Sequence, residues 1–356
     1  MEKVRIEDVA QIAKVSRATV SRVINGSHLV EAGTTERVRR VMEEVGYVPS
    51  MRRPGPKSKH AHASRLTNGT VALITIGATS NLLQEPIMVS VIDKLQECCR
   101  HRQLHLLLDQ MAHPDEIPFC VQGQQVDGAI LMVAGRPQSQ REAITRLAEI
   151  LPCVQLFAPG HSVDTVDHAT TNDVAVGAMA YRTLLDEGCR QFVAVTANLD
   201  FHEALLVRGR AFLDRAQNDE HPSFCFAKKM VQGQADRVWP SPLSVFEQMA
   251  EVAQQISKMG ASKKNPIGVF LTLEDRASQL HKALCQEGLL QSGAVKLVIA
   301  GSTPYFVGNL SPRPFLIDLG FRDIIRTSID RLIYRALNLP SDRLTLLIAP
   351  KLILQE

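Results

Sequence analysis

The residues best suited to recognise another molecule lie in one short segment near the start of the chain. Arg17, Ala18, Ser21 and Arg22 fall on one side of a helix when residues are spaced at about 100°. Arginine pairs bidentately with the O6 and N7 atoms of guanine in the major groove, and serine or threonine hydroxyls bind phosphate. The segment therefore indicates a DNA-reading surface, although the same residues also suit the solvated face of an ordinary three-helix domain.

Three short helices are expected to hold this surface in place. The first is predicted from apolar residues at i, i+3, i+4 and i+7, namely Ile6, Val9, Ala10 and Ala13. The second begins after Ser16, a good N-cap, runs to about Ile24 and stops at Asn25-Gly26. Its buried side consists of Val20, Val23 and Ile24. A turn of about four residues between the two helices predicts a helix-turn-helix.

A third helix is expected to complete this module. Thr34 or Thr35 should cap it, and Gly46 and Pro49 should close it. Its buried stripe is formed by Val38, Val41, Met42 and Val45. The second helix is too short to fold alone, so its inner stripe must anchor it while its outer face stays free.

Charge is distributed unevenly along the 356 residues. Residues 1–65 contain 13 Lys and Arg against 7 Asp and Glu, whereas the whole chain has a net charge of +3. The N-terminal module is therefore basic and the rest of the chain slightly acidic. A basic cluster at one end favours a polyanionic partner, with nucleic acid first in line.

The N-terminal motifs resemble the DNA-binding head of the lactose/galactose repressor (LacI/GalR) family. The strings that carry the resemblance are Glu7-Asp8-Val9-Ala10, Val15-Ser16-Arg17-Ala18-Thr19-Val20-Ser21-Arg22-Val23-Ile24-Asn25-Gly26 and Glu44-Val45-Gly46-Tyr47-Val48-Pro49. The resemblance implies that Arg17, Ala18 and Arg22 read bases. It places Ser16, Thr19, Ser21 and Asn25 at positions that contact phosphate. Lys14 stands where the family usually has a turn glycine.

The linker departs from that family, whose members form a short hinge helix with a leucine wedged into the minor groove. The segment here includes Arg52-Arg53-Pro54-Gly55-Pro56-Lys57, and two prolines around a glycine cannot hold an α-helix. Two interpretations stay open. In the first, Arg52, Arg53 and Lys57 form an AT-hook-like arm along an A·T-rich minor groove. In the second, they form a flexible basic linker with non-specific attraction to phosphate.

From Thr70 onward, short apolar runs alternate with amphipathic stretches. Strands are predicted at 71–76, 104–109, 128–133, 153–157, 192–196, 267–271, 296–300 and 315–319. Helical patterns lie between most of them, for example at 87–100, 141–150, 175–187 and 277–287. This alternation predicts an α/β body of two doubly wound parallel-sheet lobes, with a ligand site beyond the carboxyl ends of the strands.

The body also resembles the effector domain of that family, which has the type I periplasmic-binding-protein fold. The matching motifs are Val126-Asp127-Gly128-Ala129-Ile130-Leu131, Thr171-Asn172-Asp173 and Arg208-Gly209-Arg210-Ala211-Phe212. The resemblance implies that Arg208 contacts an effector and that Glu274 and Asp275 stand where the family binds hydroxyls. Asp173, at the strand–helix junction, joins this candidate effector-binding set. Trp239, the only tryptophan, is a candidate stacking face for a sugar.

Two departures weaken the sugar-binding pattern. Glu85-Pro86-Ile87-Met88 replaces Asn-Pro-Phe-Phe, which loses a stacking aromatic. Gly301-Ser302-Thr303-Pro304 replaces Gly-Tyr-Asp-Asp, which loses a carboxylate. Arg208, Glu274 and Asp275 can still clamp a polar ligand, with the arginine favouring a carboxylate, a phosphate or a hydroxyl-rich group. The alternative is a degenerated pocket that binds no effector.

Signatures of catalysis, metal binding and membrane insertion are missing from the sequence. It has no G-x-S-x-G elbow, phosphate loop or H-E-x-x-H motif, and its eleven histidines lack metal-ligand spacing, so we expect no enzyme, metal or cofactor. Because no apolar run approaches roughly 20 residues and the N-terminus lacks a secretory core, we expect a cytoplasmic protein without a membrane partner. Seven scattered cysteines without a C-x-x-C pair are expected to be reduced core thiols.

These observations predict a transcriptional regulator, a repressor, that binds a pseudo-palindromic operator in double-stranded DNA as a homodimer. A small sugar-like effector between the two lobes should modulate it. The predicted domains are a helix-turn-helix at 1–50, a linker or arm at 51–69, a first lobe at 70–159 with 316–341, and a second lobe at 160–315 with 342–356. The matched motifs imply that the chain crosses between the lobes near Gly160, Pro314 and Ser341.

Two other function classes stay open. One is an effector-independent architectural DNA-binding protein whose body serves only for dimerisation. The other is an enzyme that acts on a small sugar, which would require turnover that survives removal of residues 1–65.

Overall fold

The computed structural model describes residues 6–24, 30–47, 66–77, 86–133, 137–157, 164–198, 203–229, 242–272, 274–302, 307–338 and 342–353. The chain divides into two compact units, Met1–Pro56 and Lys57–Glu356, which we call the head and the body. Each unit has its own apolar core.

The head consists of three helices around a small core. They are α1 (Ile6–Ile12), α2 (Arg17–Ile24) and α3 (Ala32–Glu44). The fully buried residues come from the predicted stripes and comprise Val9, Ala10, Ala13, Val20, Val23, Val38 and Val41. The predicted helix-turn-helix is therefore confirmed.

The third helix begins earlier than predicted. Thr34 and Thr35 lie inside the first turns of α3 and do not cap it. Glu31 occupies the N-cap with φ −59° and ψ 142°, and its carbonyl accepts the Thr35 N–H at 2.9 Å. The first turn thus closes without a hydroxyl cap. Gly46 has a φ of +64° and ends the helix as predicted, whereas Asn25, Gly26 and Pro49 lie outside the described residues.

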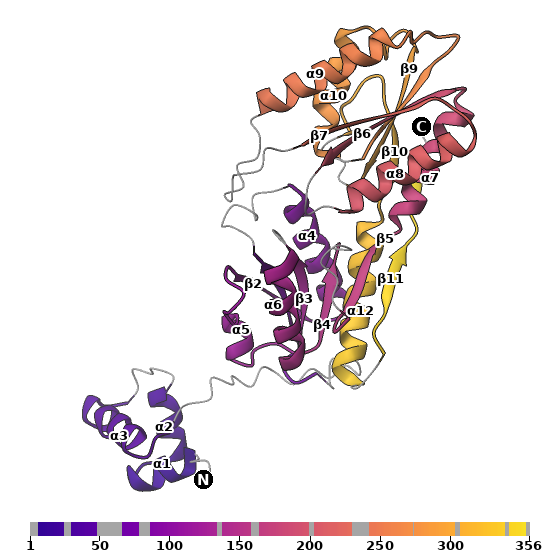
Figure 1. The fold of residues 1–356 in the computed structure, drawn as a ribbon. Coiled ribbons are helices and arrows are strands. Elements are labelled where there is room, and N and C mark those ends of the chain that lie inside the picture. The colour runs from indigo at the N-terminus through magenta and orange to yellow at the C-terminus, as the bar shows by residue number, and fades with distance from the viewer. Residues whose placement is uncertain are drawn as a thin grey trace. The chain divides into compact units, whose positions relative to one another are not determined.

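The body contains two six-stranded sheets with helices packed against them (Figure 1). The first sheet has the order β11-β5-β4-β3-β1-β2. Its strands are β1 (Thr70–Ile76), β2 (His105–Met111), β3 (Gly128–Val133), β4 (Cys153–Leu156), β5 (Asp167–Thr171) and β11 (Thr345–Ile348). All pairings between these strands are parallel.

Alternating residues of the first sheet pack against helices on opposite faces. Val71 and Leu73 join a core with α4 (Pro86–His101) and α12 (Phe321–Leu337). Ala72 and Ile74 join a second core with α5 (Phe119–Gln122) and α6 (Pro137–Ile150). The alternation follows from the two-residue period of a strand.

The second sheet has the order β12-β10-β9-β8-β6-β7, and only the described β10–β12 pair is antiparallel. Its strands are β6 (Gln191–Asn198), β7 (Ser223–Lys229), β8 (Ile267–Leu271), β9 (Val295–Gly301), β10 (Phe315–Asp318) and β12 (Lys351–Ile353). Phe192 and Phe270 pack with α7 (Asp173–Asp186) and α8 (Glu203–Asn218). Val193 and Val269 pack with α9 (Pro242–Lys258) and α10 (Ala277–Gln286).

The positions at which the chain passes between the sheets differ from the expected ones. β5 and β11 belong to the first sheet, and β10 belongs to the second. Each of these strands is the last one before the chain crosses to the other sheet, so the crossings follow Thr171, Asp318 and Ile348. The expected crossings near Gly160, Pro314 and Ser341 each lie before a strand that still belongs to the preceding sheet. β5, the last strand before the first crossing, has the sequence DHATT and lacks the apolar run that marks the predicted strands.

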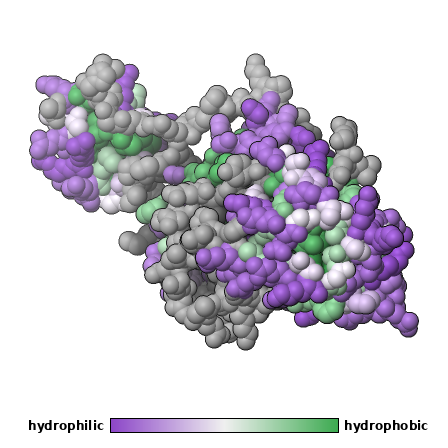
Figure 2. Space-filling view, turned by 90° about the horizontal axis from the view of Figure 1, so that it is seen from above, coloured by the Kyte–Doolittle hydropathy of each residue, from purple (hydrophilic) through white to green (hydrophobic). Residues whose placement is uncertain are grey.

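Hydrophilic and apolar residues both reach the described surface of the molecule. Figure 2 shows hydrophilic residues over much of the visible face, with apolar residues between them. In the part of the chain that the structure describes, no helix is long and apolar enough to span a membrane. All seven cysteines are free, and five are buried, but Cys225 is exposed and Cys285 half-buried, so these two are not the core thiols that we expected.

Candidate functional site

The outer face of α2 is accessible while its inner face is buried. Arg17, Ala18 and Arg22 are exposed, whereas Val20 and Val23 lie in the core of the head. Ser21 and Thr19 are half-buried at the margin of this face. An eight-residue helix thus presents two guanidinium groups to an external partner.

Ser16 fixes the start of this helix. Its Oγ accepts the Thr19 N–H at 3.1 Å and lies 2.9 Å from Thr19 Oγ1. The serine therefore satisfies one of the N–H groups that a helix leaves without an internal partner. In the preceding turn Lys14 has a φ of +51°, a left-handed conformation that glycine adopts without strain. This geometry explains why a glycine suits the position.

One carboxylate lies beside the exposed face of α2. Glu7 of α1 places Oε1 3.2 Å from Arg17 Nε, and the two side chains are 54% and 72% exposed. An ion pair this open to water contributes little to stability, on the order of 0.2–1 kcal/mol. The Glu7 carboxylate does, however, lie against the Nε side of the Arg17 guanidinium.

Five of the predicted site residues cannot be placed. Asn25, Arg52, Arg53, Lys57 and Trp239 lie outside the described residues.

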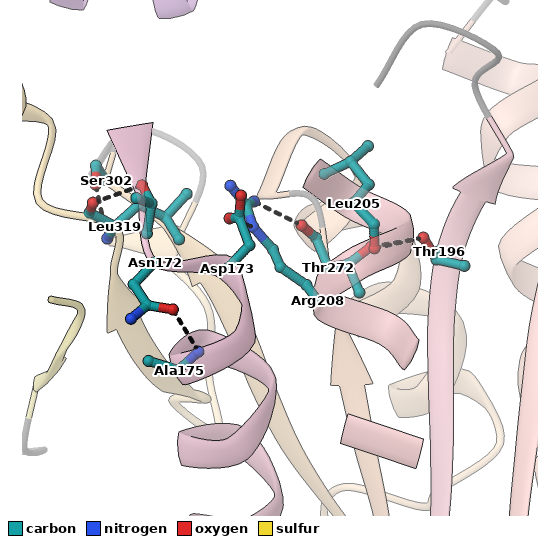
Figure 3. Close-up of polar contacts among 10 residues, drawn as sticks. Asn172, Asp173, Ala175, Thr196, Leu205, Arg208, Thr272, Ser302 and Leu319 are labelled. Atoms are coloured by element: carbon teal, nitrogen blue, oxygen red, sulfur yellow. Dashed lines mark hydrogen bonds and ion pairs between the residues drawn. The ribbon is translucent and has the colours of Figure 1, made fainter. Parts of the chain in front are cut away.

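A second group of polar side chains gathers where strands of the second sheet end. Arg208 of α8 donates from Nε to Asp173 Oδ1 at 2.6 Å and from Nη1 to the Thr272 carbonyl at 3.2 Å. Figure 3 shows these residues converging from α7, α8 and the segment after β8. The structure therefore brings the predicted Arg208 and Asp173 together.

Burial sets the electrostatics of this pair. Arg208 and Asp173 are each 7% exposed. Burial raises the pKa of the Asp173 carboxyl, and the charge and hydrogen bond of Arg208 act in the opposite direction. The Asp173 carboxylate thus depends on Arg208 to remain ionised in this buried position.

Two threonine hydroxyls that sequence reasoning missed lie next to this pair. Thr272 Oγ1 lies 2.9 Å from Thr196 Oγ1, and Thr196 Oγ1 donates to the Leu205 carbonyl at 3.4 Å. Thr196 lies near the carboxyl end of β6, and Thr272 directly follows β8. Their position at the ends of predicted strands was a signal that could have identified them.

Two glycines allow close packing around these side chains. A Cβ on Gly177 of α7 would lie 2.4 Å from the Arg208 carbonyl oxygen, so the glycine permits the close approach of α7 and α8. A Cβ on Gly301 would lie 1.8 Å from Glu274 Oε2, so this glycine leaves room for the buried Glu274 carboxylate. Glu274 and Asp275 belong to the 3-10 turn Glu274–Arg276, and Asp275 Oδ1 lies 3.9 Å from Arg276 Nε.

The crossings between the sheets are hydrogen-bonded to one another. Thr171 Oγ1 donates to the Leu319 carbonyl at 2.8 Å, and the Asn172 N–H donates to the Ile348 carbonyl at 2.8 Å. Ser302 Oγ accepts the Leu319 N–H at 3.0 Å (Figure 3). All three crossings therefore meet close to the polar group.

Asp127 holds the start of the body. Its carboxylate accepts N–H groups of Thr67, Asn68 and Thr70 at 2.9 to 3.2 Å. This carboxylate binds backbone at the point where the chain enters the first sheet. Among the described residues, no group of three His, Cys, Asp or Glu side chains is placed to hold a metal ion.

Comparison with known proteins identifies the head. Residues 5–50 match the family model described as "Bacterial regulatory proteins, lacI family". The resemblance of the N-terminal motifs is thereby confirmed.

Curated relatives align over part of their length. The chain is 27% identical over 222 residues to the HTH-type transcriptional regulator CelR of Thermobifida fusca, which covers 58% of this chain and 62% of CelR. It is 26% identical over 202 residues to the ribose operon repressor of Escherichia coli K12, which covers 55% of this chain and 56% of that repressor. The chain thus spans little more than half the length of these relatives.

Solved structures share the whole architecture. A complex of the regulator CelR with cellobiose has a TM-score of 0.60 at 18% identity, with 99% of both chains covered. A lac repressor dimer bound to operator and the anti-inducer ONPF also has a TM-score of 0.60 at 18% identity, with 99% of this chain and 98% of that chain covered. These likenesses confirm the predicted fold class of a small helical head and a two-lobed α/β body.

Proposed function

We propose that this chain, whose residues 5–50 match the lacI family model, is a sequence-specific DNA-binding transcriptional regulator. It acts as a repressor, binds its operator as a homodimer, and responds to a small polar ligand held at the group around Arg208. The observation that carries the proposal is the division of α2 into a buried apolar side and an exposed side with Arg17 and Arg22.

The outer face of α2 has the chemistry that base reading requires. Each arginine can donate two parallel hydrogen bonds to guanine in the major groove. Ala18 between them is small enough to leave room for a base edge, and Ser16 and Thr19 at the helix start can bind phosphate. Because one head makes few such contacts, two heads on a pseudo-palindrome are needed for tight binding.

Exposed apolar side chains on two edge strands and on α4 support the homodimer. Val89 of α4, Leu108 of β2 and Phe224 of β7 are exposed. β2 and β7 are each an edge strand of their sheet, and both strands lie on the same side of the body in Figure 1. A second copy that covers this side would protect both strand edges.

The group around Arg208 favours a neutral, hydroxyl-rich ligand over an anion. The guanidinium is already paired with Asp173, and an anion would have to displace that carboxylate. The predicted effector-binding residues also include three acids, Asp173, Glu274 and Asp275, against one cation, Arg208. Paired carboxylates and threonine hydroxyls suit the alternating donors and acceptors of a sugar or polyol.

The remaining expectations complete the proposal. The segment with Arg52, Arg53 and Lys57 acts as a basic arm or linker between DNA and the body. The protein works in the cytoplasm, without a catalytic step and without a cofactor. An Arg52→Ala/Arg53→Ala variant distinguishes the two roles of the segment, because an arm in the minor groove loses more affinity for operators with A·T-rich centres than for G·C-rich ones.

A second function is supported by one observation. The Arg208 guanidinium is satisfied internally by Asp173 and Thr272, which also suits a body that binds no effector and serves only for dimerisation. In that case the protein is an effector-independent architectural DNA-binding protein.

One experiment tests both functions. Bound sequences are selected from a random DNA pool with the full chain, alone and with neutral sugars, polyols, sugar acids or sugar phosphates, and the melting temperature is recorded with each compound. A regulator enriches a pseudo-palindrome, and a neutral sugar or polyol raises the melting temperature and changes operator affinity. Enrichment without any responsive compound supports the architectural protein, and selection without an enriched sequence contradicts both.

A further inference from the structure

Glu7 forms an ion pair with Arg17 on a surface that would need positive charge to bind DNA. Glu7 is therefore an acid at an unfavourable place. The carboxylate lies 3.2 Å from Arg17 Nε on the exposed side of the head. An acid at a DNA-facing surface weakens attraction to phosphate, so its presence there requires a compensating role.

Both side chains extend from fixed backbone. Glu7 is the second residue of α1, next to the core residues Val9 and Ala10. Arg17 is the first residue of α2, where the Ser16 cap fixes the helix start. The pair therefore links the two helices of the helix-turn-helix at the end of α2 from which Arg17 projects.

The geometry leaves the reading end of the arginine available. The carboxylate approaches Nε, which lies on the side of the guanidinium nearest the chain. The two terminal amino groups can then pair end-on with O6 and N7 of guanine. Holding Nε also restricts the side-chain rotations that an unpaired arginine would lose on binding.

We infer that Glu7 is a positioning residue for Arg17, which selects the guanidinium orientation that reads a base pair. This inference rests on the proposed DNA-binding function. It predicts two opposite effects of Glu7→Gln. Affinity for unrelated DNA rises, because a negative charge is removed, whereas discrimination at the base pair read by Arg17 falls.

The test uses the full chain and the operator selected as described above. Arg17→Ala first identifies the base pair that this residue reads, as the position where substitution no longer costs affinity. Dissociation constants are then measured at one ionic strength for the parent, Glu7→Gln and Asp8→Asn. Each protein is tested on the operator, on copies substituted at that base pair, and on unrelated DNA. Asp8 is an exposed acid one residue along α1, so its variant controls for the change in head charge.

The expected result for Glu7→Gln is a roughly 3- to 10-fold loss of discrimination at that base pair alone, within the range of one base contact. Its affinity for unrelated DNA should rise about 2- to 3-fold. Asp8→Asn should raise affinity for all DNA without changing discrimination. If Glu7→Gln behaves like Asp8→Asn, the inference is overturned while the proposed function stands. If Arg17→Ala keeps full discrimination at every position, the inference falls together with the reading role of Arg17.

Discussion

The head and the body each contain an arginine paired with a carboxylate, and the two pairs differ in their exposure to water. Arg17 and Glu7 in the head are 72% and 54% exposed and lie 3.2 Å apart. Arg208 and Asp173 in the body are 9% and 7% exposed as side chains and lie 2.6 Å apart. The same two functional groups therefore occupy an open surface in one unit and a closed interior in the other.

The difference in exposure decides what each arginine is free to do. In water an ion pair is weak, so Arg17 can exchange its carboxylate for an external partner at little cost. In a buried site each charge needs its partner, because water no longer solvates it. Arg208 is thus a fixed part of the body, whereas Arg17 on the exposed side of α2 can turn to an external partner.

The largest predicted effect is a difference between the two ion pairs in their contribution to the free energy of unfolding. Asp173→Ala leaves the Arg208 charge buried without its carboxylate and should lower the free energy of unfolding by about 3–5 kcal/mol. Glu7→Ala, the matched change in the head, should alter it by at most about 1 kcal/mol. Urea unfolding of the full chain, followed by circular dichroism, measures both. A loss below about 1 kcal/mol for Asp173→Ala would mean that burial does not distinguish the pairs.

The next prediction concerns the packing of α7 against α8, which positions the buried pair. A Cβ at position 177 would lie 2.4 Å from the Arg208 carbonyl oxygen and 2.7 Å from Phe212 N. Gly177→Ala should therefore force α7 and α8 apart and cost about 2–3 kcal/mol. Gly209→Ala is the control, because the nearest atom would be 3.7 Å away and alanine favours a helix. Equal thermal stability of the two variants would contradict the close approach of these helices.

The smallest predicted effect tests whether exposure to water or location in the head or the body determines the strength of an ion pair. Lys351 and Asp323 form an ion pair in the body that is also open to water, with side chains 65% and 31% exposed. The hydrogen bond from Lys351 lowers the pKa of Asp323, so the pair stabilises the fold when the carboxyl is ionised. This stability is present at neutral pH and is lost as the pH falls through the lowered folded pKa.

Lys351→Met should therefore cost about 0.5 kcal/mol near neutral pH and nothing in strong acid. Unfolding curves across acidic and neutral pH measure this difference, with Lys263→Met as the control at another exposed lysine. A loss as large as that of Asp173→Ala would show that location in the body, not burial, determines the strength of a pair.

The same contrast explains what the sequence could predict. The stripes of the head and the strands at 128–133 and 267–271 were predicted at their observed bounds, because apolar periodicity reports burial directly. β5, β7, β11 and β12 were missed. β7, β11 and β12 are edge strands with one open side, and β5, which lies inside the first sheet, has the sequence DHATT without an apolar run.

The candidate sites were predictable to different degrees. The reading face of α2 follows from local spacing, which a sequence shows. The Arg208–Asp173 pair was predicted only as two members of a set, since their contact depends on the packing of α7 against α8. The prediction that Thr34 or Thr35 caps α3 was wrong. The Glu31 carbonyl accepts the Thr35 N–H and closes the first turn, where a threonine hydroxyl was expected.

In the proposed function, the two exposed guanidinium groups on α2 choose the DNA sequence. The most direct measurement compares the parent with Arg17→Ala/Arg22→Ala at matched ionic strength, as the ratio of affinities for the selected operator and for unrelated DNA. Since each bidentate base contact contributes about 1–3 kcal/mol of discrimination, the ratio should fall by roughly 30-fold or more while the melting temperature stays unchanged. A doubly substituted protein that keeps the parent's ratio would contradict the account.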